Sequence, residues 1–73
     1  MSRLATSPPG APAVAPVRLL IVDDQPLIRR GLALMLADEP GISVVGQAAD
    51  GVEAVEQALR TRPDVVVMDL RMP

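Results

Sequence analysis

The sequence predicts an α/β protein with a parallel sheet, because short apolar runs alternate with segments of helical periodicity. Three runs rich in Val and Ile, at 17–22, 42–48 and 65–68, have the composition of strands that are buried on both faces. The two segments between them repeat apolar residues at the spacing of amphipathic helices. The order β-α-β-α-β implies right-handed crossovers and helices on both faces of the sheet.

The first strand and helix meet at an acidic pair. The strand reads Val-Arg-Leu-Leu-Ile-Val and ends at Asp23-Asp24, and Pro26 follows at a first-turn position that tolerates its missing N–H. The apolar face of this helix consists of Ile28, Leu32, Met35 and Leu36. Three charged residues lie off that face: Arg29, Arg30 and Asp38. Pro40-Gly41 ends the helix.

The second helix follows a turn at Asp50-Gly51, where we expect Asp50 to cap the helix rather than to bind a ligand. Its apolar positions are Val52, Val55 and Leu59, and its expected outward positions are Glu53, Glu56 and Arg60. Pro63-Asp64 ends this helix, and the strand 65–68 then closes on Asp69.

Composition excludes several classes of function. The 73 residues contain no Cys and no His, which excludes a disulfide framework, a thiolate metal site and a histidine base. No aromatic side chain is present to stack on bases, and the net charge of −2 disfavours binding to a phosphate backbone. No apolar run approaches the roughly 20 residues of a membrane helix, so we expect a cytoplasmic protein without direct nucleic-acid or membrane binding.

Residues 1–16 are expected to form a disordered tail ahead of a domain at 17–73. They are rich in Pro, Ala and Ser and show no apolar period. A signal peptide is excluded because five residues break any apolar helix there: Pro8, Pro9, Gly10, Pro12 and Pro16.

Carboxylates follow the first and third strands. In open α/β sheets, ligands bind beyond the carboxyl ends of the strands, so Asp23, Asp24 and Asp69 converge if these strands are neighbours. Like charges in one crevice repel, and a divalent cation relieves the repulsion. Oxygen ligands alone favour Mg²⁺, which commonly binds one or two carboxylates together with phosphate oxygens. Asp69 is the better nucleophile for an acyl phosphate, since the contiguous Asp23-Asp24 pair suits the metal.

A structural role competes with this interpretation. A single Asp after a strand is usually a turn former or a helix cap, and Asp24 or Gln25 can cap the helix that opens at Pro26. For Asp69 alone, the structural role would be favoured. The combination of an acidic pair, a single acid and a complete β-α-β-α-β frame favours the functional one.

Three blocks of the sequence resemble the receiver domain of bacterial response regulators. They are Leu-Leu-Ile-Val-Asp-Asp-Gln-Pro-Leu-Ile-Arg-Arg-Gly-Leu at 19–32, Val-Val-Gly-Gln-Ala-Ala-Asp-Gly-Val-Glu-Ala at 44–54, and Pro-Asp-Val-Val-Val-Met-Asp-Leu-Arg-Met-Pro at 63–73. The residues from Pro26 to Gly31 and from Val44 to Gly51 are most similar to regulators that carry a LuxR-type helix-turn-helix output domain. The resemblance covers residues 17–73.

The resemblance implies a flavodoxin-like (CheY-like) fold with strand order 2-1-3-4-5. It implies Mg²⁺ held by Asp23, Asp24, Asp69 and the backbone carbonyl of Arg71. It also implies that Asp69 is the phosphoacceptor of a two-component phosphorelay, receives its phosphoryl group from a histidine kinase, and controls transcription through a C-terminal DNA-binding domain.

The chain departs from the family pattern by its length. The Ser/Thr after strand four and the Lys after strand five of the family have no counterpart, and the chain contains no lysine. We therefore expect a truncated receiver that lacks its last two strands and is deficient in phosphorylation. The open edge of the third strand would also allow a homodimer.

Three other functions compete with the phosphoacceptor. A phosphatase of the haloacid-dehalogenase type carries the motif Asp-x-Asp after its first strand. Here the two acids are adjacent, and Gln25 occupies the place of the second Asp of that motif. A dinucleotide-binding half-domain needs a Gly-rich turn in place of Asp23-Asp24. The third alternative is an inert or purely protein-binding fragment. Unlike a phosphoacceptor, it would gain no mass when incubated with acetyl phosphate and Mg²⁺.

Overall fold

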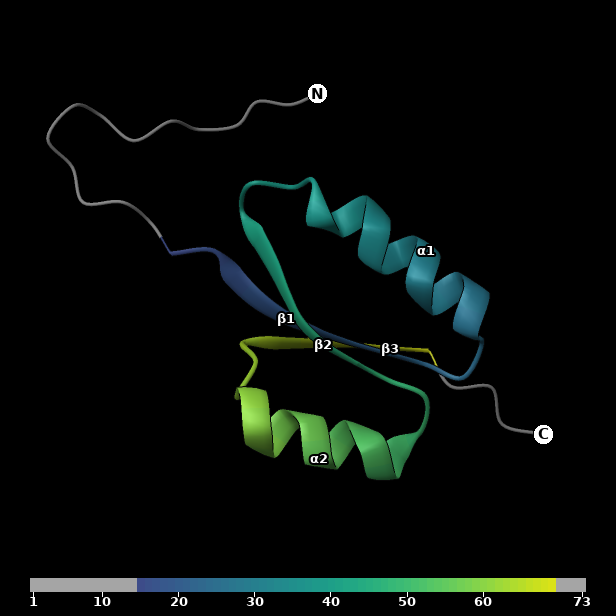
Figure 1. The fold of residues 1–73 in the computed structure, drawn as a ribbon. Coiled ribbons are helices and arrows are strands. Elements are labelled where there is room, and N and C mark those ends of the chain that lie inside the picture. The colour runs from purple at the N-terminus through teal and green to yellow at the C-terminus, as the bar shows by residue number, and fades with distance from the viewer. Residues whose placement is uncertain (1–14, 70–73) are drawn as a thin grey trace, which may run out of the picture.

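A computed structural model describes residues 15–69, and residues 1–14 and 70–73 lie outside the described part (Figure 1). The expected tail at 1–16 and the expected carbonyl ligand at Arg71 therefore fall almost wholly outside it. The predicted β-α-β-α-β order is confirmed. The elements are β1 (Val17–Asp23), α1 (Pro26–Ala37), β2 (Ile42–Ala48), α2 (Gly51–Thr61) and β3 (Val65–Asp69).

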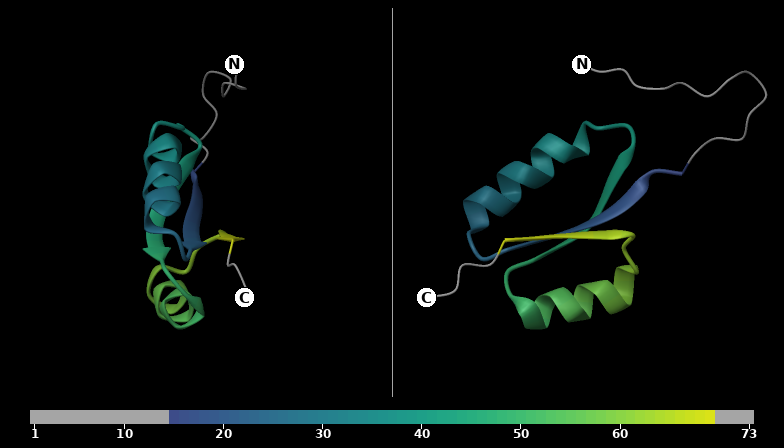
Figure 2. Two further views of the ribbon diagram at one scale, coloured as in Figure 1. Left: turned by 90° about the vertical axis from the view of Figure 1, so that its right-hand side faces the viewer. Right: turned by 180° about the vertical axis from the view of Figure 1, so that it is seen from behind.

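The three strands form one parallel sheet in the order β2-β1-β3. The chain crosses from β1 to one neighbour through α1, and then from β2 to the other side of β1 through α2. Right-handed crossovers that run in opposite directions place their helices on opposite faces of a sheet. Accordingly, α1 lies on one side of the sheet and α2 on the other in all three views (Figures 1 and 2).

The core lies around the central strand. Leu20 and Val22 of β1 are fully buried and pack with Ala48 of β2 and Ala54 of α2, and Ala58 is half-buried against them. Leu19 and Ile21 alternate with these residues and are buried on the face that carries α1. β1 is therefore an apolar strand covered on both faces, as its composition predicts.

A bulge in β2 brings the backbone of this strand close to α2. Leu19 pairs with Val44 whereas Leu20 pairs with Gly46, so Val45 is an extra residue in the ladder. A Cβ atom added at Gly46 would lie 2.7 Å from Oε1 of Gln57 and 3.2 Å from Cδ1 of Leu20. Only glycine fits at this contact without movement of its neighbours.

The predicted buried face of α2 is wrong. Val52, Val55 and Leu59, the face expected to be buried, are 73%, 60% and 75% exposed. The helix instead packs through Ala54 and Ala58. The small side chains of these two alanines suit the close approach of β2 at Gly46, whereas the larger apolar side chains of the helix are exposed.

β3 and α1 leave apolar surface uncovered. β3 pairs only with β1 within residues 15–69, and its apolar side chains are 38–55% exposed. In α1 no residue is fully buried; Leu32 and Leu36 are half-buried, whereas Met35, from the same predicted face, is 72% exposed. Neither helix of the described residues is long and apolar enough to span a membrane.

Candidate functional site

The carboxylates that follow β1 and β3 are register partners. Asp23, the last residue of β1, pairs with Asp69, the last residue of β3. Neighbouring strands lie about 4.8 Å apart, and paired residues project from the same face of the sheet. The sheet therefore brings two of the three predicted acids side by side at its carboxyl edge.

Asp23 is held in place by local hydrogen bonds. Its side chain is only 4% exposed, and Oδ1 accepts a bond of 2.8 Å from the backbone N–H of Gln25. The backbone carbonyl of Asp23 accepts a bond of 2.8 Å from Nη1 of Arg29 in the first turn of α1. Asp23 thus stabilises the turn that precedes α1 through Oδ1, and the bond from Gln25 does not involve Oδ2.

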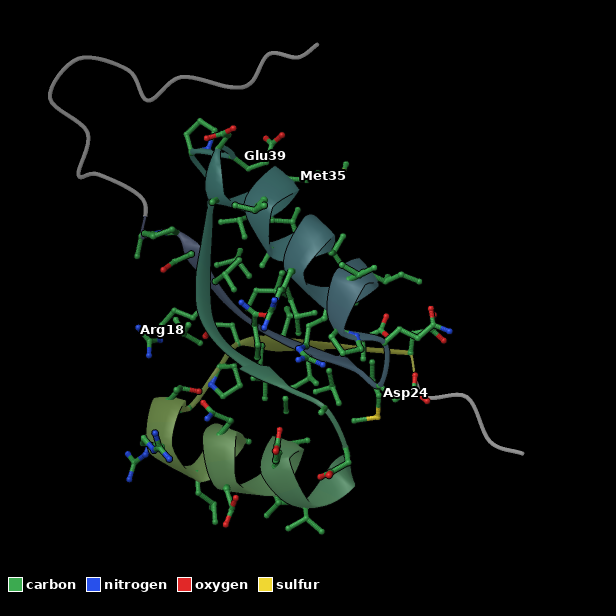
Figure 3. All side chains as sticks on the ribbon, turned by 45° about the vertical axis from the view of Figure 1, so that its right-hand side comes forward. Arg18, Asp24, Met35 and Glu39 are labelled. Carbon is green, nitrogen blue, oxygen red and sulfur yellow. The ribbon has the colours of Figure 1, made fainter. Side chains whose placement is uncertain are left out.

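Asp24 and Asp69 differ from Asp23 in being exposed. Asp24 lies in the turn between β1 and α1, at the end of the sheet where β1 and β3 stop (Figure 3). It does not cap the helix, because the N-cap residue is Gln25, whose side chain makes no capping hydrogen bond. The expected alternative, in which Asp24 is a simple cap, is therefore not what the structure contains.

Asp50 has the capping role that its sequence context predicts. Its side chain accepts a bond of 2.8 Å from the backbone N–H of Glu53, and Oε1 of Glu53 accepts a bond of 2.8 Å from the N–H of Ala49. Asp50 also follows a strand and lies at the same edge of the sheet, but its Oδ1 is engaged by the first turn of α2.

The donor atoms at this edge suit a hard cation that keeps part of its hydration shell. Within residues 15–69, no three acidic side chains are gathered closely enough to form a complete metal centre. Asp23 and Asp69 are nevertheless paired at this edge, and one or two carboxylates are the protein contribution that Mg²⁺ commonly needs, since it retains several waters. This pair fits Mg²⁺ as a partly hydrated ion, and Asp24 in the adjoining turn stays a predicted third donor.

Sequence reasoning missed Arg29. The residue lies off the apolar stripe of α1, yet its guanidinium reaches back to the end of β1. No periodicity indicates this contact. The sequence does place Arg29 six residues after Asp23. At that distance, one turn of helix brings its side chain back to the end of β1.

Comparison with known proteins agrees with this arrangement. The family model of the response regulator receiver domain matches residues 19–73. The chain is 40% identical to the signal receiver domain of the putative response regulator NarL from Mycobacterium tuberculosis, with a TM-score of 0.73 over 82% of this chain and 48% of that one.

Two curated relatives are longer proteins that contain a similar segment. Over 57 residues, 78% of the chain, it is 51% identical to response regulator GacA from Pseudomonas viridiflava and 56% identical to a protein-glutamate methylesterase/protein-glutamine glutaminase from Alkalilimnicola ehrlichii. It spans 27% of the first and 15% of the second. The phosphatase and dinucleotide-binding alternatives are set aside by these matches, and the chain belongs to the response regulator receiver domain family.

Proposed function

We propose that this segment is a phosphoacceptor of a two-component phosphorelay, with Asp69 as the residue that becomes phosphorylated. The observation that carries the proposal is the register pair of Asp23 and Asp69 at the carboxyl edge of the sheet, with Asp24 in the adjoining turn. Asp23 is buried and bonded within its turn, whereas Asp69 is exposed to an incoming donor. That difference supports Asp69, rather than Asp23, as the nucleophile.

The proposed reaction transfers a phosphoryl group between two side chains. A carboxylate oxygen of Asp69 forms a bond to phosphorus as the bond from phosphorus to the donor's histidine nitrogen breaks, and the electron pair remains with the imidazole. Asp69 then carries an acyl phosphate. When bound, Mg²⁺ would neutralise charge on the phosphoryl oxygens at this edge. Asp23 and Asp24 would hold that ion, and the backbone carbonyl of Arg71 is a further proposed ligand.

The proposed partner is a histidine kinase, in the cytoplasm, and the proposed output is transcriptional control through a helix-turn-helix domain. The match to a methylesterase shows that a receiver of this kind also occurs in proteins with another output. That activity belongs to the relative, of which the chain spans 15%, and we assign no enzymatic reaction to this segment.

The test measures Mg²⁺-dependent phosphorylation by acetyl phosphate, read by intact mass. Two proteins are compared: the 73-residue chain, and a chimera in which residues 15–73 replace the matching half of the Mycobacterium tuberculosis NarL receiver. We expect the chimera to be labelled only with Mg²⁺ present, and the 73-residue chain to be slow, because loss of one preorganised charge-stabilising group can cost about 10²–10³ in rate.

Asp24→Ala should weaken Mg²⁺ binding and labelling of the chimera. The matched control is Asp38→Ala, another exposed carboxylate, which caps the far end of α1. Labelling that is independent of Mg²⁺, or equal effects of the two substitutions, would count against the proposed metal site.

A further inference from the structure

Arg29 closes the turn that carries the acidic pair. Its Nη1 donates to the backbone carbonyl of Asp23 at 2.8 Å, while the N–H of Gln25 donates to the Asp23 carboxylate at 2.8 Å. The two bonds fix both the backbone and the side chain of Asp23 against the first turn of α1. Asp24 lies between the two tethered positions, so its backbone is fixed from both sides.

The position of Arg29 is electrostatically unusual for a helix. The N-terminal turn of a helix carries a partial positive charge and favours acidic side chains. The first turn of α1 contains no acidic residue, and its fourth residue is the half-buried Arg29. Helix stability therefore does not explain a cation at this place, whereas the bond that it donates to the Asp23 carbonyl does.

We propose that Arg29 is a positioning residue for the acidic edge: by holding the carbonyl of Asp23, it orients the carboxylates of Asp23 and Asp24 toward a divalent cation. This inference rests on the proposed function, because it concerns the same Mg²⁺ site. Arg29 acts through Asp23 and does not itself contact the ion, which a positively charged guanidinium would repel.

The direction in which the Mg²⁺ affinity changes when Arg29 is removed distinguishes a positioning role from a purely electrostatic one. If Arg29 influenced the site only through its charge, removing it would tighten Mg²⁺ binding, because a cation near the site repels another cation. If it holds the turn, removing it weakens binding. Substitution of a residue that orients a metal ligand typically lowers metal affinity about 10–100-fold. We therefore expect Arg29→Met to weaken Mg²⁺ binding about tenfold.

The experiment measures Mg²⁺ dissociation constants of the 73-residue chain by NMR titration of backbone amides. Arg29→Met is compared with Arg30→Met, which removes the same charge from the same turn. Arg30 is exposed and lines a hollow of about 410 Å³ with Val44 and Gln47 of β2, the strand on the opposite side of β1 from β3. We expect Arg30→Met to leave Mg²⁺ binding unchanged or slightly tighter, and Arg29→Lys, which keeps a charged donor, to restore part of the affinity.

A wild-type chain that does not bind Mg²⁺ would overturn the proposed metal site itself. Wild-type binding with unchanged or tighter binding in Arg29→Met would overturn only the role of Arg29. If Arg29→Met unfolds, the wild-type titration decides: the Arg29 guanidinium signals and the Gln25 amide should shift together as Mg²⁺ binds. A Gln25 amide that responds while the Arg29 guanidinium does not would contradict the positioning role.

Discussion

At the scale of single residues, three aspartates at the carboxyl edge of the sheet have three different roles. Asp23 is buried and organises a turn, Asp50 caps a helix, and Asp69 ends a strand with its side chain exposed. All three follow strands of the same parallel sheet. Their hydrogen bonds, and not their sequence positions, determine which of them is available for chemistry.

Loss of the cap at Asp50 gives a prediction about stability. Asp50→Ala removes the bond to the N–H of Glu53 and should lower the free energy of unfolding by about 1 kcal/mol. Asp38→Ala is the control, because Asp38 is an exposed carboxylate at a helix C-terminus, where its charge is unfavourable. Urea denaturation followed by circular dichroism measures both. Equal stability of Asp50→Ala and the wild type would show that the cap is dispensable.

The sequence predicts that Asp23 and Asp69 meet at one edge of the sheet, because the carboxyl ends of neighbouring parallel strands lie there, and their register pairing confirms this. The contacts within that edge could not be predicted. The bond from Arg29 to the Asp23 carbonyl could not be predicted, since it depends on the path of a long side chain across a turn. Arg71, the expected carbonyl ligand, lies outside the described residues and remains a prediction.

At the scale of elements, the packing of α2 is determined by backbone approach. Gly46, placed by the bulge at Val45, lets β2 come within contact of Gln57, and Ala54 and Ala58 fill the remaining space. The element boundaries could be predicted because Pro, Gly and acidic residues mark them. The buried face could not, since hydrophobicity alone favoured Val52, Val55 and Leu59 over two alanines.

Gly46→Ala should therefore destabilise the fold by about 1 kcal/mol, because the added Cβ would lie 3.2 Å from Cδ1 of the fully buried Leu20 and 2.7 Å from Oε1 of Gln57, whose flexible side chain can move only partly aside. Its cost should fall in a Gln57→Ala background, since the closest atom is then absent. Gly31→Ala is the control, because nothing lies within 4 Å of a Cβ there and the substitution suits a helix. Thermal unfolding is measured for five proteins: the wild type, Gly46→Ala, Gln57→Ala, the double variant and Gly31→Ala. A Gly46→Ala variant as stable as Gly31→Ala would contradict the close contact.

The opposite end of the sheet is fixed by a separate set of bonds. The carboxylate of Asp64 accepts from the N–H of Arg18 at 2.9 Å, and the N–H of Asp64 donates to the Arg18 carbonyl at 2.8 Å. Nη2 of Arg18 donates to the carbonyl of Thr61 at 2.6 Å, which links the end of α2 to β1. These bonds fix the starts of β1 and β3, so the register that brings Asp23 beside Asp69 is anchored from the other end of both strands.

At the scale of the whole molecule, β3 is an edge strand with apolar side chains. Val65, Val66, Val67 and Met68 are 45%, 43%, 38% and 55% exposed, and no charge interrupts them. An exposed apolar edge pairs readily with another chain. The expectation that the third strand has an open edge is confirmed for the described residues.

The 73-residue chain should therefore self-associate through β3. Val66→Lys places a charge in the edge strand and should shift the chain toward monomer in sedimentation velocity. Leu27→Lys is the control, because Leu27 is 84% exposed on α1, away from that edge. Association that is equally sensitive to both substitutions would indicate general hydrophobic contact and not strand pairing.

The location of the acyl phosphate tests the central claim most directly. The chimera with the NarL receiver is incubated with acetyl phosphate and Mg²⁺, reduced with borohydride to trap the acyl phosphate, and mapped by tandem mass spectrometry. We predict modification at Asp69 alone, and none in Asp69→Asn or Asp69→Ala, because no other carboxylate ends β3. Modification of Asp23, Asp24 or Asp50 in the wild-type sequence, or persistent labelling of Asp69→Asn, would contradict the assignment of Asp69 as the phosphoacceptor.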